Sequence, residues 1–148
     1  YRFASSRDRT RGYERALARA GIELRPGYLR EGTQIDHLAR GIAIDLLRLP
    51  QRPTAIFAAS DQQALGVLEA AKILGIRVPE ELSVVGFDDV EVSAYIGLTT
   101  VHQPLFESGR RGAELLLRML AGDEPVEPHV EQLEIDVVVR TTTAVPPG

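Results

Sequence analysis

The stretch that decides the fold is Leu82-Ser83-Val84-Val85-Gly86-Phe87-Asp88-Asp89-Val90. Its first five residues carry only apolar or small side chains, a pattern typical of a strand buried on both faces. Two adjacent carboxylates, Asp88 and Asp89, follow almost at once. In an open α/β sheet, ligands bind in the crevice beyond the carboxyl ends of the strands. This acidic pair is therefore the first place to look for a functional site.

Working outward, helical and strand patterns alternate along the chain. Helices are expected over 9–20, 35–49, 62–74 and 106–121, and strands over 28–31, 54–59, 82–87, 98–101 and 132–140. This alternation indicates βαβ units, so the expected class is α/β, an open parallel sheet with helices on both faces. The first helix has no clear strand before it, although a right-handed βαβ crossover needs one. We therefore expect the sequence to be the later part of a larger protein, cut just before or inside a strand.

The composition limits the classes of function. The chain has 148 residues, which suits one domain, and a net charge of −4 without clustered Lys and Arg, so it carries no nucleic-acid footprint of its own. It has no cysteine, which excludes disulfides and thiolate metal sites. No apolar run approaches the roughly 20 residues of a membrane span, so no membrane partner is expected.

Common catalytic and cofactor motifs are absent from the sequence. It lacks the glycine-rich phosphate loops, the H-E-x-x-H zinc motif and the G-x-S-x-G nucleophile motif. The three histidines, His37, His102 and His129, lie far apart without metal-ligand spacing and are expected on the surface or in loops. We therefore expect a binding protein without a cofactor, not an enzyme.

Three interpretations of Asp88 and Asp89 are open from the residues alone. The pair could cap a turn. One carboxylate could instead face the crevice and accept hydrogen bonds from ligand hydroxyls. A metal site would need another carboxylate, which Asp61 could supply, and a basic residue at a neighbouring strand end. The only lysine, Lys72, lies in the middle of a predicted helix, which disfavours the metal site.

Arg9 is a second candidate residue. It lies four residues before Tyr13, on the helix face expected to pack on the sheet. A buried Arg needs a partner, and a cation at a helix N-terminus opposes the macrodipole. Arg9 therefore points to an anion or a set of acceptors near Asp88. The alternative is that the helix begins later and Arg9 is solvated among neighbouring charged residues.

The predicted helix over 62–74 carries apolar residues away from its sheet-facing stripe. Leu65 and Ile73 fall beside Glu69 and Lys72 on the opposite side. Such residues can be ordinary exposed side chains or part of a partner surface. We favour the partner surface.

Taken together, these segments resemble the LacI/GalR family of transcriptional regulators. The resemblance is strongest over 77–89, which spells Arg-Val-Pro-Glu-Glu-Leu-Ser-Val-Val-Gly-Phe-Asp-Asp. It extends, in the right order and spacing, to residues 9–13, 52–61, 64–66, 98–104 and the helix near 107–109. It thus covers nearly the whole chain.

The resemblance implies a fold and a domain organisation. Family members have an N-terminal helix-turn-helix followed by a type I periplasmic-binding-protein-like core of two α/β subdomains. This chain resembles the C-terminal part of that core. Residues 1–101 and 141–148 would belong to the C-terminal subdomain, and residues 102–140 would cross into the N-terminal subdomain. The DNA-binding headpiece and the first strand of the C-terminal subdomain would lie outside this sequence.

The resemblance also implies roles for individual residues. Asp88 and Arg9 correspond to effector contacts, Ser60 to a polar effector contact that varies between members, and Gln103 to a position near the ligand. From the residues alone either Ser60 or Asp61 could cap the following helix, and the resemblance favours Asp61 for this role. Asp89 is expected to hold the loop in which it lies. Leu65 and Tyr95 match dimer-interface positions, and Ile73 is expected to join them.

The expected function is therefore the effector-sensing part of a cytoplasmic, homodimeric, allosteric regulator. Its effector would be a small molecule, most simply a sugar or sugar derivative, bound in the cleft between the subdomains. Operator DNA would be contacted only through the headpiece. The alternative is a solute-binding protein of a sugar ABC transporter, because the two classes share a fold.

Overall fold

A computed structural model of the protein describes residues 4–32, 36–122 and 130–146. Its sheet has the strand order β1-β2-β3-β4. β1 (Ala55–Phe57), β2 (Ser83–Asp88) and β3 (Thr99–His102) run parallel, and β4 (Asp136–Val138) is antiparallel to β3. The predicted class, an open and mostly parallel α/β sheet, is confirmed, with one antiparallel edge strand that the prediction lacked.

The expected buried strand is β2, an inner strand of this sheet. Val84 is fully buried and Phe87 is largely buried, whereas Ser83 and Val85 are only partly buried. The expected burial on both faces is therefore incomplete. α3 (Asp61–Ile73) packs against β2, and α2 (Asp36–Leu47) packs against α3. The helices meet through small side chains, including Ala43, Ala64 and Ala70, all nearly inaccessible to solvent. Close approach of backbone to backbone thus builds the core that supports the carboxyl end of β2.

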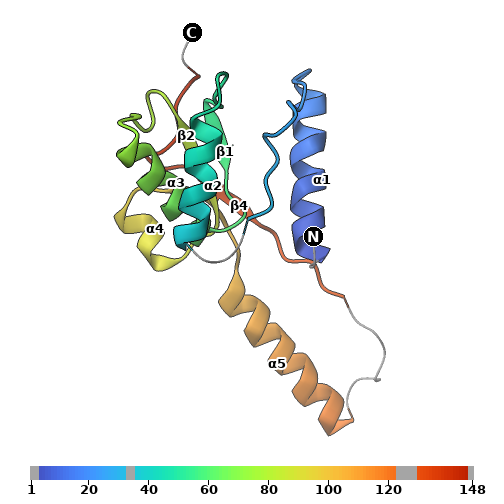
Figure 1. Cartoon of the computed structure of the whole chain (residues 1–148). Coiled ribbons are helices and arrows are strands. Elements are labelled where there is room, and N and C mark those ends of the chain that lie inside the picture. Colours follow the sequence, from blue (N-terminus) through green and yellow to red (C-terminus); the bar gives the residue numbers. More distant parts are fainter. Residues whose placement is uncertain (1–3, 33–35, 123–129, 147–148) are drawn as a thin grey trace.

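α1 (Ala4–Arg19) stands apart from α2 and β1 in Figure 1. It begins five residues before the predicted start at Arg9. None of its described residues is buried, so the expectation that its apolar face packs on the sheet is wrong. That face instead looks across a groove of about 330 Å³ towards β1 and α2, lined in part by Tyr13, Leu29, Ala43, Leu46, Ile56 and Val67.

Two strand predictions near this groove also differ from the structure. Residues 28–31 form no strand, because no neighbouring strand pairs with them in the described part of the chain. The stretch 54–59 does contain β1, but β1 is not buried: Phe57 is 38% exposed. The reason is that β1 forms the edge of the sheet beside the groove.

The chain leaves the sheet after β3 and returns to it at β4. α5 (Leu105–Ala121) extends away from the sheet (Figure 1). Most of its apolar residues are exposed, including Phe106 by 86% and Leu120 by 75%. After β4 the chain packs along β2, where Thr142 accepts from Val84 N through its carbonyl and donates to Val84 O through its hydroxyl. The tail is therefore part of the sheet's packing.

The remaining differences concern short elements. α4 (Glu91–Tyr95) was not predicted, because five residues give too little periodicity to detect. β4 covers only three of the residues predicted as a strand over 132–140, and Asp136 and Val137 are exposed.

Candidate functional site

The turn that follows β2 has an unusual backbone. Asp88 has φ 119° and Asp89 has φ 58°, and these are the non-glycine residues with positive φ in the described ranges. Positive φ is unfavourable for residues with a Cβ, so such a conformation persists only where the surroundings impose it. The turn directs the two carboxylates to different partners.

Asp88 faces the start of the crossing to α5. The side-chain amide of Gln103 donates to Asp88 Oδ1 at 2.6 Å. Partial burial raises the pKa of Asp88, opposed by this hydrogen bond and by the positive charge of Arg9. The prediction placed Asp88 and Gln103 at one site, and the structure brings them together. A partly desolvated carboxylate is a strong acceptor for hydroxyl groups.

Arg9 reaches the same edge of the sheet from α1. Its NH1 donates to the carbonyl of Ala59, just beyond β1, at 2.9 Å. Its guanidinium lies 3.9 Å from the centroid of the Phe87 ring, and Phe57 meets Phe87 edge to face. A cation over an aromatic face is attracted by the ring's quadrupole. The stacking and the hydrogen bond fix the head of Arg9 beside the ends of β1 and β2.

Ser60 lies next to this cluster but has a structural task as well. It is the N-cap of α3, and its hydroxyl accepts from Gln63 N at 3.2 Å. The expectation that Asp61 caps this helix is therefore wrong. Asp61 is the first helical residue, so its side chain turns into the protein interior instead of back over the helix end.

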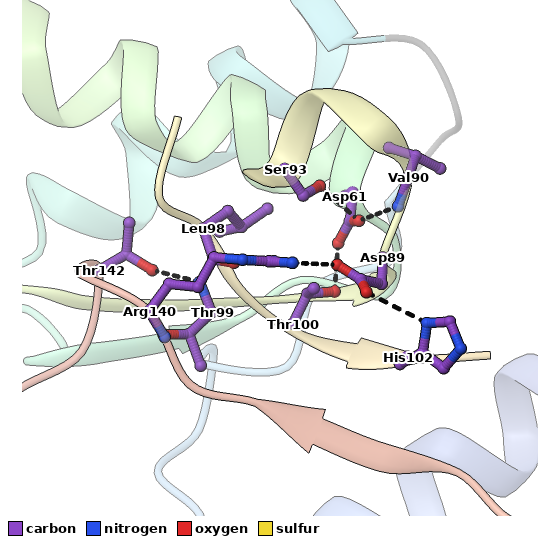
Figure 2. Close-up of polar contacts among 10 residues, drawn as sticks. All are labelled: Asp61, Asp89, Val90, Ser93, Leu98, Thr99, Thr100, His102, Arg140 and Thr142. Carbon is purple, nitrogen blue, oxygen red and sulfur yellow. Dashed lines mark hydrogen bonds and ion pairs between the residues drawn. The ribbon is translucent and has the colours of Figure 1, made fainter. Parts of the chain in front are cut away.

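Asp61 is fully buried under the turn. Its carboxylate accepts from Val90 N at 2.9 Å, from the Ser93 hydroxyl at 2.6 Å and from the Thr100 hydroxyl at 2.5 Å (Figure 2). Three donors satisfy a charged acceptor that would otherwise be costly to bury. Sequence reasoning missed this role, although Gly86 within the buried strand was a signal of close approach by another group.

Asp89 holds the other side of the turn, as expected. It pairs with Arg140 at 2.7 Å and with His102 Nδ1 at 3.1 Å (Figure 2). Arg140 also donates to Leu98 O at 2.7 Å. His102, expected on the surface or in a loop, ends β3 and contacts Asp89 of the turn. Arg140 was not recognised from the sequence at all.

The residues predicted for a dimer interface lie away from this cluster. Ile73 on α3 is 57% exposed and Tyr95 on α4 is 80% exposed. Leu65 on α3 is partly buried and so less accessible. The side chains are accessible to a partner, as a docking face requires.

The apolar groove beside α1 is a separate feature. Arg9 and Ala59 line it, but Asp88 and Gln103 do not. Of the three side chains Arg9, Asp88 and Gln103, only Arg9 therefore borders the groove.

Metal and membrane sites were also considered. Within residues 4–32, 36–122 and 130–146, no group of three or more His, Asp or Glu side chains is arranged to hold a metal ion. Asp61, the proposed third carboxylate of such a site, is occupied by its three donors. No helix among the described residues has the length and hydropathy to cross a membrane.

Comparisons with known proteins agree with the α/β fold described above. The sequence matches the periplasmic binding protein-like domain family over residues 2–143. It is 38% identical over 137 residues to the HTH-type transcriptional repressor CytR of Escherichia coli K12, a match covering 91% of this chain and 40% of CytR. The chain thus spans less than half of this curated relative.

Solved structures of LacI-family proteins superpose well on the chain. The dimeric Lac repressor gives a TM-score of 0.85 at 33% identity, over 97% of this chain and 52% of the repressor. A LacI family regulator from Enterococcus faecium, with bound ribose, gives 0.82 at 30% identity, over 92% of this chain and 51% of the regulator. The chain belongs to the periplasmic binding protein-like domain family, in the form that serves as the effector-binding core of LacI/GalR regulators.

Proposed function

We propose that this chain is the effector-sensing part of a LacI-type DNA-binding transcriptional regulator. Its effector is a small molecule, most simply a sugar or sugar derivative. The observation that carries this proposal is the convergence of Arg9, Asp88 and Gln103, which come from three separate segments and meet at the carboxyl ends of the strands.

The chemistry of the cluster suits a polyhydroxylated ligand. Asp88 is an acceptor, Gln103 offers both a donor and an acceptor, and the hydroxyl of Ser60 can still donate while its oxygen caps α3. The guanidinium of Arg9 carries five N–H donors, and its contact with Ala59 uses one. A sugar ring presents hydroxyls that donate and accept, so it matches this mixture better than a purely anionic or apolar ligand.

The second wall of the cleft is proposed to come from another subdomain. We infer that residues 1–101 and 141–148 belong to the C-terminal subdomain and that residues 102–140 cross into the N-terminal one and return, with β4 pairing to β3 where the chain comes back. The direction of α5 away from the sheet and its exposed apolar residues support this division. The free edge of β1 beside the apolar groove suits a strand added from an earlier segment, as the family's fold implies.

The regulator is further proposed to be a cytoplasmic homodimer that uses Leu65, Ile73 and Tyr95 at its interface. Operator DNA is contacted by a helix-turn-helix headpiece outside this chain, and ligand binding changes the equilibrium between open and closed subdomains. CytR is an HTH-type transcriptional repressor, which supports this assignment over a transporter's solute-binding protein.

The proposal is tested by thermal shift on the full-length protein with a panel of pentoses, hexoses, disaccharides and nucleosides. Binding of one compound should raise the melting temperature in a concentration-dependent manner. Asp88→Ala and Arg9→Met should each weaken that binding by about tenfold or more, as loss of a charge-assisted hydrogen bond predicts.

Two matched substitutions on α1 serve as controls. Asp8→Ala and Arg11→Met remove the same kinds of charge from side chains that are each 71% exposed. They should leave affinity unchanged. Full affinity in the Asp88→Ala protein would exclude the proposed ligand site.

A further inference from the structure

The strained turn of the candidate site is joined to three other elements through one buried side chain. Asp61, at the start of α3, is inaccessible to solvent, so it cannot contact a ligand itself. Its three donors come from the residue after the turn (Val90), from α4 (Ser93) and from β3 (Thr100). One carboxylate thus connects the ends of neighbouring strands with the helix that follows the turn.

The position of Asp61 requires Gly86. A Cβ on Gly86 would lie 2.2 Å from Asp61 Oδ1, closer than any real contact, and 3.0 Å from Leu98 Cδ2. The carboxylate therefore lies directly against the backbone of β2, two residues before Asp88. Because Asp61 also follows Ser60 in sequence, this contact sets the end of β1 relative to the end of β2.

The turn needs such support because its backbone is unfavourable. Both Asp88 and Asp89 have positive φ, and neither is a glycine. The Val90 amide, immediately after them, donates to Asp61 and fixes the exit of the turn. On the opposite side, Asp89 is held by Arg140 and His102. The Val90–Asp61 bond and the Asp89 pairs therefore hold the turn on both sides, and this fixes the direction of the Asp88 carboxylate.

We propose that Asp61 is a positioning residue of the ligand site, which holds the Asp88–Asp89 turn in its strained conformation without touching the ligand. This inference rests on the proposed role of Asp88 as the ligand's acceptor. A positioning role of Asp61 differs from simply starting α3 or filling the core. If Asp61 positions the turn, loosening its contacts should change the surroundings of Asp88 specifically.

The test compares graded substitutions in the full-length protein. Asp61→Ala removes all three bonds. Asp61→Asn can keep the bonds to Val90 and Ser93 through its remaining oxygen, since the Thr100 hydroxyl can rotate to accept. Thr100→Val removes one bond and leaves the charge of Asp61 in place. Leu47→Ala, a change in the buried core of α2, is the control for general loss of stability.

The first measurement is hydrogen–deuterium exchange of peptides that cover residues 86–95. Relative to the rest of the protein, Asp61→Ala should accelerate their exchange by about tenfold or more, with Asp61→Asn and Thr100→Val giving smaller increases. Leu47→Ala should not single out these peptides. If all variants exchange like the Leu47→Ala control in this region, Asp61 does not hold the turn.

The second measurement is the pKa of Asp88 from ¹³C carboxyl NMR, assigned by Asp88→Asn. In wild type, burial raises this pKa above its ordinary value of 3.8. When the turn loosens, Asp88 gains water, and its pKa should fall towards 3.8, including in Thr100→Val, which keeps the Asp61 charge. An unchanged pKa in Thr100→Val together with unchanged exchange would overturn the inference.

Neither measurement uses an effector. A protein that binds none of the sugars but shows these changes would contradict the proposed ligand class while supporting the positioning of the turn. If a sugar binds but the Asp61 variants change neither the exchange of residues 86–95 nor the pKa of Asp88, the ligand class is supported and the positioning role of Asp61 is contradicted.

Discussion

Asp89 and Arg140 form a 2.7 Å ion pair across 51 residues of sequence. Both side chains are largely buried, at 16% and 19% exposed, so the pair is shielded from salt and water more than a surface pair. Arg140 additionally donates to the carbonyl of Leu98 and through its backbone amide to Thr99. The pair fastens the Asp88–Asp89 turn to the segment that follows β4.

Arg140→Met should therefore destabilise the protein. Among the described residues, the substitution leaves the Asp89 carboxylate with His102 as its remaining side-chain partner, and it removes the bond to Leu98 O. The free energy of unfolding should therefore fall by about 2 kcal/mol. Urea unfolding monitored by circular dichroism measures the change. Arg77→Met is the control, because Arg77 is 72% exposed in its pair with Glu81, and should lower the free energy of unfolding much less. Equal effects of the two variants would show that the Asp89 pair contributes no more than a surface pair.

Gly86→Ala should be among the most damaging small substitutions in the chain. Its Cβ would meet Asp61 Oδ1 and Leu98, both of which are fully buried and cannot retreat. We expect a loss of about 3 kcal/mol or more in unfolding free energy. Gly12→Ala is the matched control, because nothing lies within 4 Å of its Cβ position in α1. It should stabilise the protein slightly through its helix propensity. A mild effect at Gly86 would mean that the Asp61 contact is not close.

Asp88→Asn should change the pH dependence of stability. The pKa of Asp88 is raised in the folded protein, mainly by burial, so the folded state binds its proton more tightly than the unfolded state. The contribution of this proton to stability is fully present below the unfolded pKa of about 3.8 and is lost as pH rises through the folded pKa.

An asparagine side chain does not titrate, so the Asp88→Asn protein does not lose this stability as pH rises. Its free energy of unfolding relative to wild type should therefore increase between pH 3 and pH 7. The increase should be less than about 1 kcal/mol, because Asp88 is only partly buried. Thermal denaturation across this range measures the difference, with the exposed Asp8→Asn as control. A difference that shrinks as pH rises would contradict the sign of the shift.

Ile73→Asp and Tyr95→Glu should weaken self-association if these residues form the proposed interface. Burying a charge in an apolar interface is unfavourable, so the dimer dissociation constant should rise by about tenfold or more for either variant. Analytical ultracentrifugation of the full-length protein measures it. Ile22→Asp is the control, because Ile22 is exposed by 57%, the same fraction as Ile73, but follows α1. If Ile22→Asp alone weakened the dimer, the interface would lie near α1 instead.

The sequence predicted best where a pattern depends on local structure. The continuous apolar run before Asp88 identified β2 as a strand of the core. Its burial on both faces was overestimated, because Val85 is only partly buried. The strand-end rule pointed to Asp88, because parallel strands end on the same side of a sheet. The residues alone left Arg9 between a place near Asp88 and a solvated position, and the family resemblance favoured the first. Gln103 was added by the resemblance only.

It failed where tertiary contacts decide. Ser60 and Asp61 are both favoured helix caps, and only the packing of α3 against β2 makes one the cap and the other a buried acceptor. Arg140 resembles any cation at a strand end until its approach to Asp89 is known. The burial of β1 was overestimated, because an apolar strand beside a groove has the same composition as one inside a sheet.

The two partners of Asp89 have a mechanical consequence. His102 belongs to the strand that leaves for α5, and Arg140 follows the strand that returns, so both crossings are attached to the same carboxylate. Asp89 therefore contacts both crossing segments near the base of α5, and α5 extends outward from that point. Its 17 residues span about 25 Å, so a rotation of about 5° at its base would move its far end by about 2 Å. A small rotation at the Asp88–Asp89 turn would in this way produce a larger displacement at the far end of α5.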